Sequence, residues 1–366
     1  MPLKILVLSN YRSTITVRPE AEIFIGLQKA GHQITIMTYG DSEYAEKFKE
    51  VGIKLIDFHS QKKLNAQEIA FIHAEIIAGD YDIMHLFNGR SMVNGIQAAK
   101  RTKVKVVLYR GFEGHIHWYD PSAYFKFLHA RVDAIMCNSE GVAEHIAKAS
   151  ILRKPRLITV NKGHRLEWYQ DIEAFKPSDL DLPADGFYAV CAANNRRMKG
   201  VPYLLKSFAH LPPEANVHLL LLGKDMDTEE NKKIVAALPN PQNIHFMGWR
   251  PDSLRIVKMA DTFILASLYG ESITKSVLEG MSLGTPALIS NIPGNREMIE
   301  DGVSGYVVPK ADPQAMGQAL LKMYQNPKKT KAMGKAALER IKNRFSSEIT
   351  IKGYEKAYLS LLKDKK

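Results

Sequence analysis

The stretch Gly270–Pro286 reads GESITKSVLEGMSLGTP. The apolar run Thr262–Ala266 before it predicts a short buried strand. Residues Ser276–Leu283 predict a helix that the following glycine and proline end. This places Glu271 in the loop before the helix and Glu279 within it. Eight helical residues rise about 12 Å, which is an upper guide to the separation of these two carboxylates because part of the span is loop.

Two interpretations of this carboxylate pair follow from the spacing. The free backbone N–H groups at the start of the helix and its dipole favour a negatively charged group. A nucleotide-sugar has a diphosphate between two hydroxyl-bearing ends and a similar length. The alternative is a capping box, with Ser276 as the N-cap and Glu279 as the third helical residue. The spacing alone leaves both roles of Glu279 open.

The composition indicates a globular protein with more than one core. The chain has 366 residues, of which 45% are hydrophobic and 24% charged, enough for two domains. Cys137 and Cys191 lie in apolar runs, which predicts buried structural thiols and no disulfide framework. No apolar window has the length of a membrane-spanning helix, and Met1–Asn10 predicts a first strand rather than a signal peptide. We therefore expect a cytoplasmic protein.

The net charge of +11 gathers in two clusters. The first contains Lys148, Arg153, Lys154, Arg156, Lys162 and Arg165, and the second Lys100, Arg101, Lys103, Lys105 and Arg110. One interpretation is a solvated surface; another is attraction to anionic lipid headgroups or to a pyrophosphate-linked substrate. No helix-turn-helix, zinc spacing or stacking motif supports nucleic acid as the partner.

Strand-like and helix-like segments alternate along the whole chain, which predicts an α/β fold with parallel sheets covered on both faces. The first series of strands is Lys4–Ser9, Gln33–Met37, Tyr81–Phe87, Lys105–Tyr109 and Ala134–Asn138, with a helix over Pro19–Ala30. The second is Tyr188–Ala192, His218–Leu222, Ile244–Phe246, Thr262–Ala266, Ala287–Ser290 and Gly305–Val308. Two Rossmann-like domains are therefore expected. The turn-rich segment 176–186 suggests domains over 1–170 and 171–345, with a last helix in 346–366.

The motifs of the second half resemble those of the retaining GT-B glycosyltransferases of family 4. The resemblance rests on the paired glutamates of Gly270–Pro286, on Met198-Lys199-Gly200, and on the segments Asn243–Arg250, Asn291–Ile299 and Asp301–Pro309. It implies two Rossmann-like domains facing a central cleft and a C-terminal helix that crosses back to the N-terminal domain. The N-terminal domain would bind the acceptor and the C-terminal domain a nucleotide-diphosphate sugar.

The resemblance also implies roles on the donor side. Lys199 would hold the diphosphate, with Arg196 or Arg197 in the place of a family arginine that is absent from its usual position; cations stabilise such a leaving group. Glu279 would accept hydrogen bonds from the ribose, and Glu271 would hold hydroxyls of the donor sugar. The backbone N–H groups of Ser272, Ile273 and Thr274 would face the donor. We expect a UDP- or GDP-sugar, no permanent cofactor and no metal, since no His, Asp and Glu spacing suits one.

The N-terminal half departs from the family pattern. The loop Asn10–Pro19 has no glycine, and its Arg12 and Arg18 face either an anionic acceptor or water. Arg110 stands where relatives often have a histidine, and the following loop carries Glu113, His115 and His117, whose histidines are either structural or functional. The candidate catalytic residues are therefore Glu271, Lys199, Arg110 and His115.

We expect a retaining glycosyltransferase that moves a sugar from a nucleotide-diphosphate donor to a hydroxyl of a glycan or lipid-linked glycan. Cell-surface polysaccharide, lipopolysaccharide or glycolipid assembly suits the basic character of the chain. A cytoplasmic location is expected, with peripheral binding to the inner face of the cell membrane as the alternative. Two other interpretations are a nucleotide-sugar epimerase of the same fold and a catalytically inactive partner subunit. A DNA-modifying transferase is more remote. The oligomeric state stays open.

Overall fold

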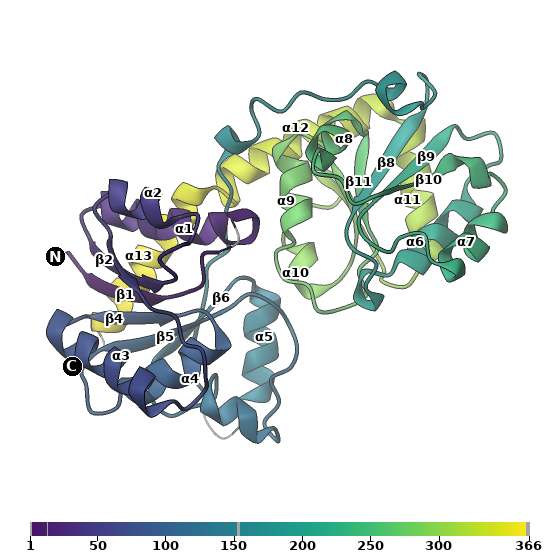
Figure 1. Cartoon of the computed structure of the whole chain (residues 1–366). Helices are drawn as coiled ribbons and strands as arrows, with labels where there is room; N and C mark the ends of the chain where they lie inside the picture. Colours follow the sequence, from purple (N-terminus) through teal and green to yellow (C-terminus); the bar gives the residue numbers. More distant parts are fainter. Residues whose placement is uncertain (1, 13, 152–153, 364–366) are drawn as a thin grey trace. The chain divides into compact units, whose positions relative to one another are not determined.

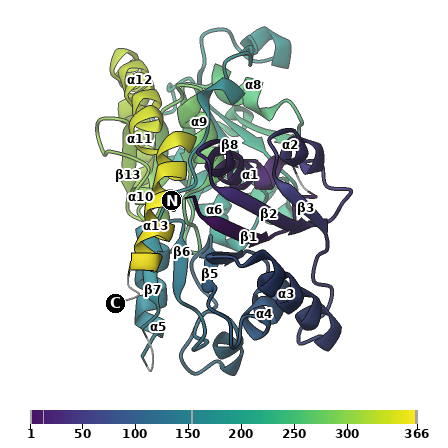
Figure 2. The ribbon, with the colours of Figure 1, turned by 90° about the vertical axis from the view of Figure 1, so that its left-hand side faces the viewer.

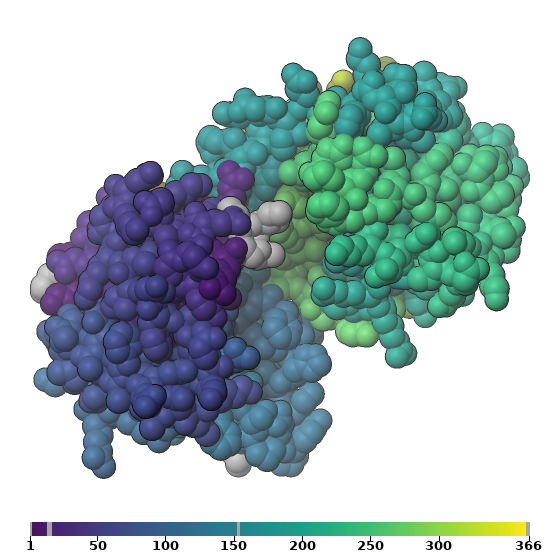
Figure 3. Space-filling view, viewed as in Figure 1, coloured from purple at the N-terminus to yellow at the C-terminus, as the bar shows by residue number. Residues whose placement is uncertain are grey.

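The computed structural model describes residues 2–12, 14–151 and 154–363. The chain forms two compact units (Figure 1). Unit 1 contains the residues up to Gly163 together with those from Ser347 onward, and unit 2 runs from His164 to Ser346. Each unit is built on one parallel sheet, as the alternation of segments predicts. Figure 3 shows the atoms on the face of the molecule that Figure 1 presents.

Unit 1 has a seven-stranded sheet with the order β3-β2-β1-β4-β5-β6-β7. Its strands are β1 Lys4–Leu8, β2 Gln33–Thr38, β3 Lys54–Asp57, β4 Ile83–Leu86, β5 Lys105–Arg110, β6 Ala134–Cys137 and β7 Arg156–Thr159. Its helices are α1 Thr14–Lys29, α2 Ala45–Glu50, α3 Ala66–Gly79, α4 Gly89–Ala98, α5 Glu140–Ala149 and α13 Ser347–Lys363.

The first sheet is covered on both faces because its strands are apolar on both. In β1, Ile5 and Val7 belong to one buried cluster, and Leu6 and Leu8 to another. Alternate residues of a strand point to opposite faces, so these clusters are the two sides of one sheet. Helices α1 and α13 cover the first side and α3 to α5 the second (Figures 1 and 2). Such two-sided burial explains why the strands show continuous apolar runs.

The last helix packs on the first sheet, as the family resemblance implies. Tyr354, Tyr358 and Leu361 of α13 are buried in the same cluster as Phe24 of α1. The Tyr358 hydroxyl lies 2.6 Å from Nδ1 of His85, a fully buried residue of β4. Within the described residues, the other ring nitrogen of His85 has no hydrogen-bond partner. Burial, together with the charge of Lys162, holds the pKa of His85 well below its usual value, so the ring is neutral.

This neutral histidine predicts an acid-sensitive fold. The unfolded imidazole takes up a proton below about pH 6.5 whereas the folded one does not. The unfolded chain then binds more protons, so the free energy of unfolding falls as the pH falls, by up to about 1.4 kcal/mol per pH unit. Denaturation of wild type and His85→Gln between pH 7 and pH 5 checks this. The variant should show a shallower slope, and equal slopes would assign the pH dependence to other groups.

Unit 2 has a six-stranded sheet with the order β10-β9-β8-β11-β12-β13. Its strands are β8 Phe187–Ala192, β9 Val217–Leu222, β10 Ile244–Gly248, β11 Thr262–Leu265, β12 Ala287–Ser290 and β13 Gly305–Val308. Its helices are α6 Val201–Ser207, α7 Glu229–Ala236, α8 Ser253–Met259, α9 Lys275–Ser282, α10 Pro293–Arg296, α11 Pro313–Gln325 and α12 Pro327–Arg344. One buried cluster unites the sheet with all of these helices except α10.

Some local expectations need correction. The helix predicted over Pro19–Ala30 begins at Thr14 and contains Pro19, so the loop after β1 is shorter than predicted; Ser13 lies outside the described residues.

Cys137 and Cys191 are buried free thiols, as predicted, and burial raises the pKa of each to about 12.

Neither basic cluster is one continuous surface. In the first, Lys162 is half-buried and paired with the buried Glu20, and Arg153 lies outside the described residues. In the second, Lys105 begins β5 and Arg110 ends it. The five steps from the first to the last residue of this strand span about 16 Å, so the sheet holds these two cations at opposite edges. Basic residues that are close in sequence therefore do not form one basic surface in either cluster. Among the described residues, no helix combines the length and apolar character needed to cross a bilayer.

Candidate functional site

Unit 2 brings Lys199 and Glu271 together at the centre of its sheet. The chain order reverses between the neighbouring strands β8 and β11, which makes this the topological switch point where open α/β sheets bind ligands. Lys199 follows β8, and Glu271 follows β11. The Lys199 ammonium donates a hydrogen bond to Oε1 of Glu271, and the two side chains are 15% and 10% exposed. Two residues predicted from separate motifs therefore form one ion pair.

Three further residues orient the Glu271 carboxylate. Ser267 Oγ donates to Oε1 at 2.9 Å, and Thr274 Oγ1 lies 3.2 Å from Oε2. Thr274 Oγ1 is also 2.6 Å from the side-chain amide of the fully buried Asn295. The Asn295 atom in this contact is Oδ1, an acceptor, and a hydroxyl has one proton, so the Thr274 hydroxyl donates to either Asn295 or Glu271. The carboxylate is thus held from the side of the protein.

Close backbone approaches fix the loops that carry this pair. The Leu268 N–H donates to the Met198 carbonyl at 2.7 Å, which joins the loop after β11 to the loop after β8. Gly200 has φ +64°, and a Cβ there would lie 2.1 Å from the carbonyl oxygen of Ala266. A Cβ on Gly294 would lie 2.4 Å from Cα of Ser272. The glycines of the Lys199-Gly200 and Gly294–Glu297 motifs therefore serve close packing at the site.

Helix α9 begins directly after the Glu271 loop. Its N-cap is Thr274, so the interpretation of Ser276 as the N-cap of a capping box is wrong. Glu279 instead accepts a hydrogen bond from Lys275, four residues earlier on the same helix face. The N-cap side chain of Thr274 does not cap the first turn of α9, because its hydroxyl faces Glu271 and Asn295. Ser272, Ile273 and Thr274 are buried.

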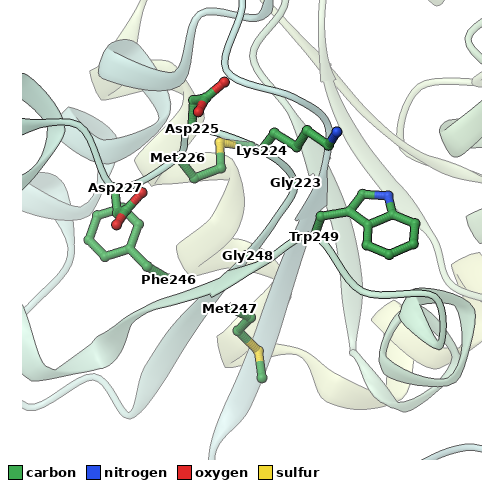
Figure 4. A pocket seen from close by; sticks show the side chains of 9 residues that line it. All are labelled: Gly223, Lys224, Asp225, Met226, Asp227, Phe246, Met247, Gly248 and Trp249. Atoms are coloured by element: carbon green, nitrogen blue, oxygen red, sulfur yellow. The ribbon is translucent and has the colours of Figure 1, made fainter.

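A second feature of unit 2 is a pocket of about 490 Å³ at the carboxyl ends of β9 and β10. It is lined by Gly223–Asp227 and Phe246–Trp249 (Figure 4). Lys224 and the indole of Trp249 project to one side of the view, and Asp225 and Asp227 to the other. Hydrogen bonds of 3.0 and 3.1 Å join Lys224 to Asn195 and Asn194, in the loop that leads to Lys199. The pocket therefore adjoins the loop that carries the ion pair.

Other predicted donor-side residues do not join the pair. Arg196 and Arg197 are exposed, and neither forms a salt bridge within the described residues. Across residues 2–12, 14–151 and 154–363, no group of three His, Cys, Asp or Glu side chains is placed to hold a metal ion.

The sequence analysis missed Ser267 and Asn295. A signal existed for Ser267, a polar residue that directly follows a buried strand. Asn295 sits inside the Gly294–Glu297 turn that the motif had already drawn attention to.

Unit 1 places Arg110 at the carboxyl end of β5. The residue is only 7% exposed, and its guanidinium lines a pocket of about 460 Å³. His115, the other candidate catalytic residue of this unit, is exposed, has φ +58° and is not among the residues that line the pocket. His117 is exposed and stacks on Tyr119. Arg12 is paired with Asp41 at 3.0 Å. Of the four residues Arg110, His115, His117 and Arg12, Arg110 lines this pocket of unit 1.

Comparison with known proteins covers both units. Residues 173–340 match the family described as glycosyl transferases group 1, and residues 21–167 match glycosyltransferase family 4. One curated relative is the lipopolysaccharide core biosynthesis glycosyltransferase LpsE of Rhizobium meliloti (strain 1021), with 26% identity over 243 residues. The match covers 66% of this chain and 66% of that protein.

Solved structures share the fold over nearly the whole chain. A glycosyltransferase from Rickettsia africae ESF-5 superimposes with a TM-score of 0.83 and 18% identity, over 99% of both chains. Anabaena HepE, solved in complex with UDP, has a TM-score of 0.76 and 16% identity, over 98% of this chain and 100% of that one. At identities this low, the structural likeness shows the fold alone. The matches to the two family descriptions show the family. The chain therefore belongs to the GT-B glycosyltransferases of family 4, which are also called group 1.

Proposed function

We propose that this protein is a retaining glycosyltransferase that takes a sugar from a nucleotide-diphosphate donor and attaches it to a hydroxyl of a glycan or lipid-linked glycan. The observation that carries the proposal is the Lys199–Glu271 pair at the switch point of the second sheet, beside the start of α9. These groups match the parts of a nucleotide-sugar. The cation suits the diphosphate, the carboxylate suits the sugar hydroxyls, and the helix N-terminus favours the negative charge of the phosphates.

Lys199 has the donors needed to hold a diphosphate. An ammonium has three N–H groups, and Glu271 accepts from one of them. The remaining two can donate to phosphate oxygens. As the bond between the sugar and the diphosphate breaks, negative charge grows on the departing oxygen, and a fixed cation stabilises that charge more than it stabilises the bound donor. Lys199 would thereby speed the chemical step.

Glu271 and Glu279 would position the two ends of the donor. The Glu271 carboxylate accepts from Lys199 and Ser267 and contacts the Thr274 hydroxyl, and two carboxylate oxygens offer about four acceptor positions. One position then serves a hydroxyl of the donor sugar. Glu279 would accept from the ribose hydroxyls. The Trp249 indole in the neighbouring pocket is 62% exposed and offers a face on which a nucleobase stacks.

The reaction then balances without a separate acid or base. The acceptor oxygen forms a bond to the anomeric carbon while the bond from that carbon to the diphosphate oxygen breaks. The acceptor proton passes to the departing phosphate oxygen on the same face of the sugar, so the configuration is retained. The products are the glycosylated acceptor and a nucleoside diphosphate. This course follows the usual proposal for the family that the motifs resemble.

The acceptor side belongs, in this proposal, to unit 1. The name of the Rhizobium relative places that protein in lipopolysaccharide core synthesis, which supports a role of this chain in cell-surface polysaccharide or glycolipid assembly. The UDP complex of the Anabaena protein supports a nucleotide donor, with a UDP-sugar as the first candidate and a GDP-sugar as the second. We propose a cytoplasmic location, with peripheral binding at the membrane where lipid-linked acceptors would be met.

A thermal-shift screen tests the donor class. The protein is heated with UDP, GDP, ADP or CMP, and then with the corresponding nucleotide-sugars. A ligand that binds the folded state raises the melting temperature by mass action, and at 100 times its dissociation constant it stabilises by about 2.7 kcal/mol. We expect one nucleoside diphosphate to stabilise the protein. No shift with any nucleotide would contradict the proposal.

The Glu279→Ala variant tests the ribose role. Hydrogen bonds to a charged group contribute about 1.5–3 kcal/mol, so the affinity for the nucleoside diphosphate should fall by about 10- to 100-fold in calorimetry. Lys275→Ala is the matched control, because it removes the salt-bridge partner and leaves the carboxylate in place. Unchanged affinity in Glu279→Ala would leave that residue a structural role on α9 only.

A further inference from the structure

The pocket of unit 1 combines cations with aromatic walls. It lies at the carboxyl ends of β4 and β5, next to the point where the chain order of the first sheet reverses between β1 and β4. Four aromatic side chains line it, together with two cations: Phe87, Tyr109, Phe112, Phe127, Arg110 and Lys126. Its volume of about 460 Å³ suits a small ligand or one residue of a larger one.

Arg110 is held rigidly in this wall. Its Nε donates to the Phe112 carbonyl at 3.0 Å, and a terminal N–H group donates to the Gly114 carbonyl. The guanidinium carbon lies 3.5 Å from the centre of the Phe112 ring and 5.0 Å from that of Phe127. A guanidinium has five N–H donors, and these bonds use two of them. The fork is therefore set in place with donors to spare.

The charge of this fork is not neutralised by a carboxylate. Within the described residues, neither Arg110 nor Lys126 forms a salt bridge. Burial lowers the pKa of Arg110 to about 10. Burial also lowers the pKa of Lys126, and the nearby charges of Lys63 and Arg110 act in the same direction, opposed by the charge of Asp120. A buried cation beside a second, half-buried one carries a free-energy cost that a bound anion reduces.

We propose that this pocket binds an anionic group, a carboxylate or a phosphate, attached to a sugar ring of the acceptor. Arg110 and Lys126 receive the anion, and the aromatic side chains receive the apolar face of the ring. A planar guanidinium fork matches both anions with two parallel hydrogen bonds. The assignment of this ligand as an acceptor rests on the proposed function, whereas the anion site itself rests on the geometry of unit 1.

Two matched probes test the site on the full chain. Benzyl β-D-glucuronide and benzyl β-D-glucoside differ in the carboxylate alone, and calorimetry compares their affinities. We expect the glucuronide to bind at least about tenfold more tightly, and its affinity to fall with added salt because the contact is ionic. Benzyl phosphate is the second arm: tighter binding of the glucuronide identifies a carboxylate ligand, and tighter binding of the phosphate identifies a phosphate ligand. Equal affinity for glucuronide and glucoside, or no binding of any anionic probe, would overturn the proposal.

Variants locate the binding. Arg110→Gln should abolish glucuronide binding, and Lys126→Gln should weaken it several-fold. Arg110 also holds backbone carbonyls of its loop. Among the described residues the Lys126 side chain forms no hydrogen bond to the backbone, so the Lys126 variant keeps the test decisive if the first fails to fold. Lys29→Gln is the control of equal charge, because Lys29 is exposed at the end of α1 and does not line the pocket. A loss in the control equal to that in Lys126→Gln would overturn the assignment.

The same samples separate this inference from the proposed function. Stabilisation by the nucleoside diphosphate reports on unit 2, and glucuronide binding reports on unit 1. Nucleotide binding without glucuronide binding would sink the anion site alone. Glucuronide binding without any nucleotide binding would leave the anion site standing and sink the donor-binding proposal.

Discussion

Replacement of Lys199 by alanine is expected to lower the turnover of sugar transfer by about 100- to 1,000-fold, the size of effect seen when one preorganised electrostatic stabiliser is removed. The ammonium lies against Glu271 at the switch point of the second sheet and is 15% exposed, so water cannot readily replace it. The rate should fall more than the affinity for the nucleotide, because the charge on the leaving phosphate grows only as the bond breaks. Steady-state kinetics together with calorimetry of the nucleoside diphosphate measures both.

Three comparisons make this result specific. Lys206→Ala removes an exposed lysine from α6 of the same unit and should leave turnover unchanged. Lys199→Arg restores the positive charge with a different shape and should recover part of the rate. If Lys199→Ala loses nucleotide affinity and turnover in equal measure, the residue contributes to binding but has no special role in bond breaking. Near-normal turnover would remove Lys199 from the site altogether.

Replacement of Lys162 by methionine is expected to destabilise unit 1 by about 3–5 kcal/mol, the cost of leaving one member of a buried ion pair without its partner. Lys162 Nζ lies 2.9 Å from Oε2 of Glu20, and the two side chains are 16% and 7% exposed. Ser9 Oγ donates to the other carboxylate oxygen at 2.5 Å, and the Lys162 ammonium lies 3.9 Å from the centre of the Tyr109 ring. The substitution would leave the Glu20 charge buried among these groups. Chemical denaturation measures the change.

The matched control is the exposed pair of Lys49 and Glu46, whose nitrogen and oxygen are 2.8 Å apart. Lys49→Met should cost less than about 1 kcal/mol, because water solvates the remaining carboxylate. The double variant Glu20→Gln with Lys162→Met should be more stable than Lys162→Met alone, since no buried charge is left over. A loss in Lys162→Met no larger than that in Lys49→Met would contradict the importance assigned to burial.

The stability of this pair should also depend on alkaline pH. Burial disfavours the Lys162 ammonium, but Glu20 and Tyr109 outweigh this cost and raise its pKa above the usual value of 10.5. The stabilisation is therefore fully present below about pH 10.5 and is lost as the pH rises through the folded-state pKa.

Local sequence patterns predict most of the fold and half of the candidate site. The alternation of apolar strands with amphipathic segments predicts both parallel sheets, because each element reflects a period that a short window contains. Lys199 and Glu271 were named from short motifs, and the structure pairs them across 72 residues of sequence. Thr274 was expected to offer its backbone N–H, but its hydroxyl also orients Glu271. The capping interpretation of Glu279 failed because the start of a helix is uncertain by a residue or two in sequence.

The sequence by itself determined the class of fold, the family and the two residues Lys199 and Glu271 that the structure pairs, because these depend on local hydrophobic periods and on contiguous motifs. Only the tertiary structure decided which cations are paired with a carboxylate and which line a pocket. Lys162 looked like part of a basic surface, yet it pairs with Glu20 from 142 residues earlier, and Arg110 looked like part of another, yet it lines an aromatic pocket. Burial and ion pairing are set by strands and helices that are distant in the chain, so the sign of a charge can be read from sequence but its surroundings cannot.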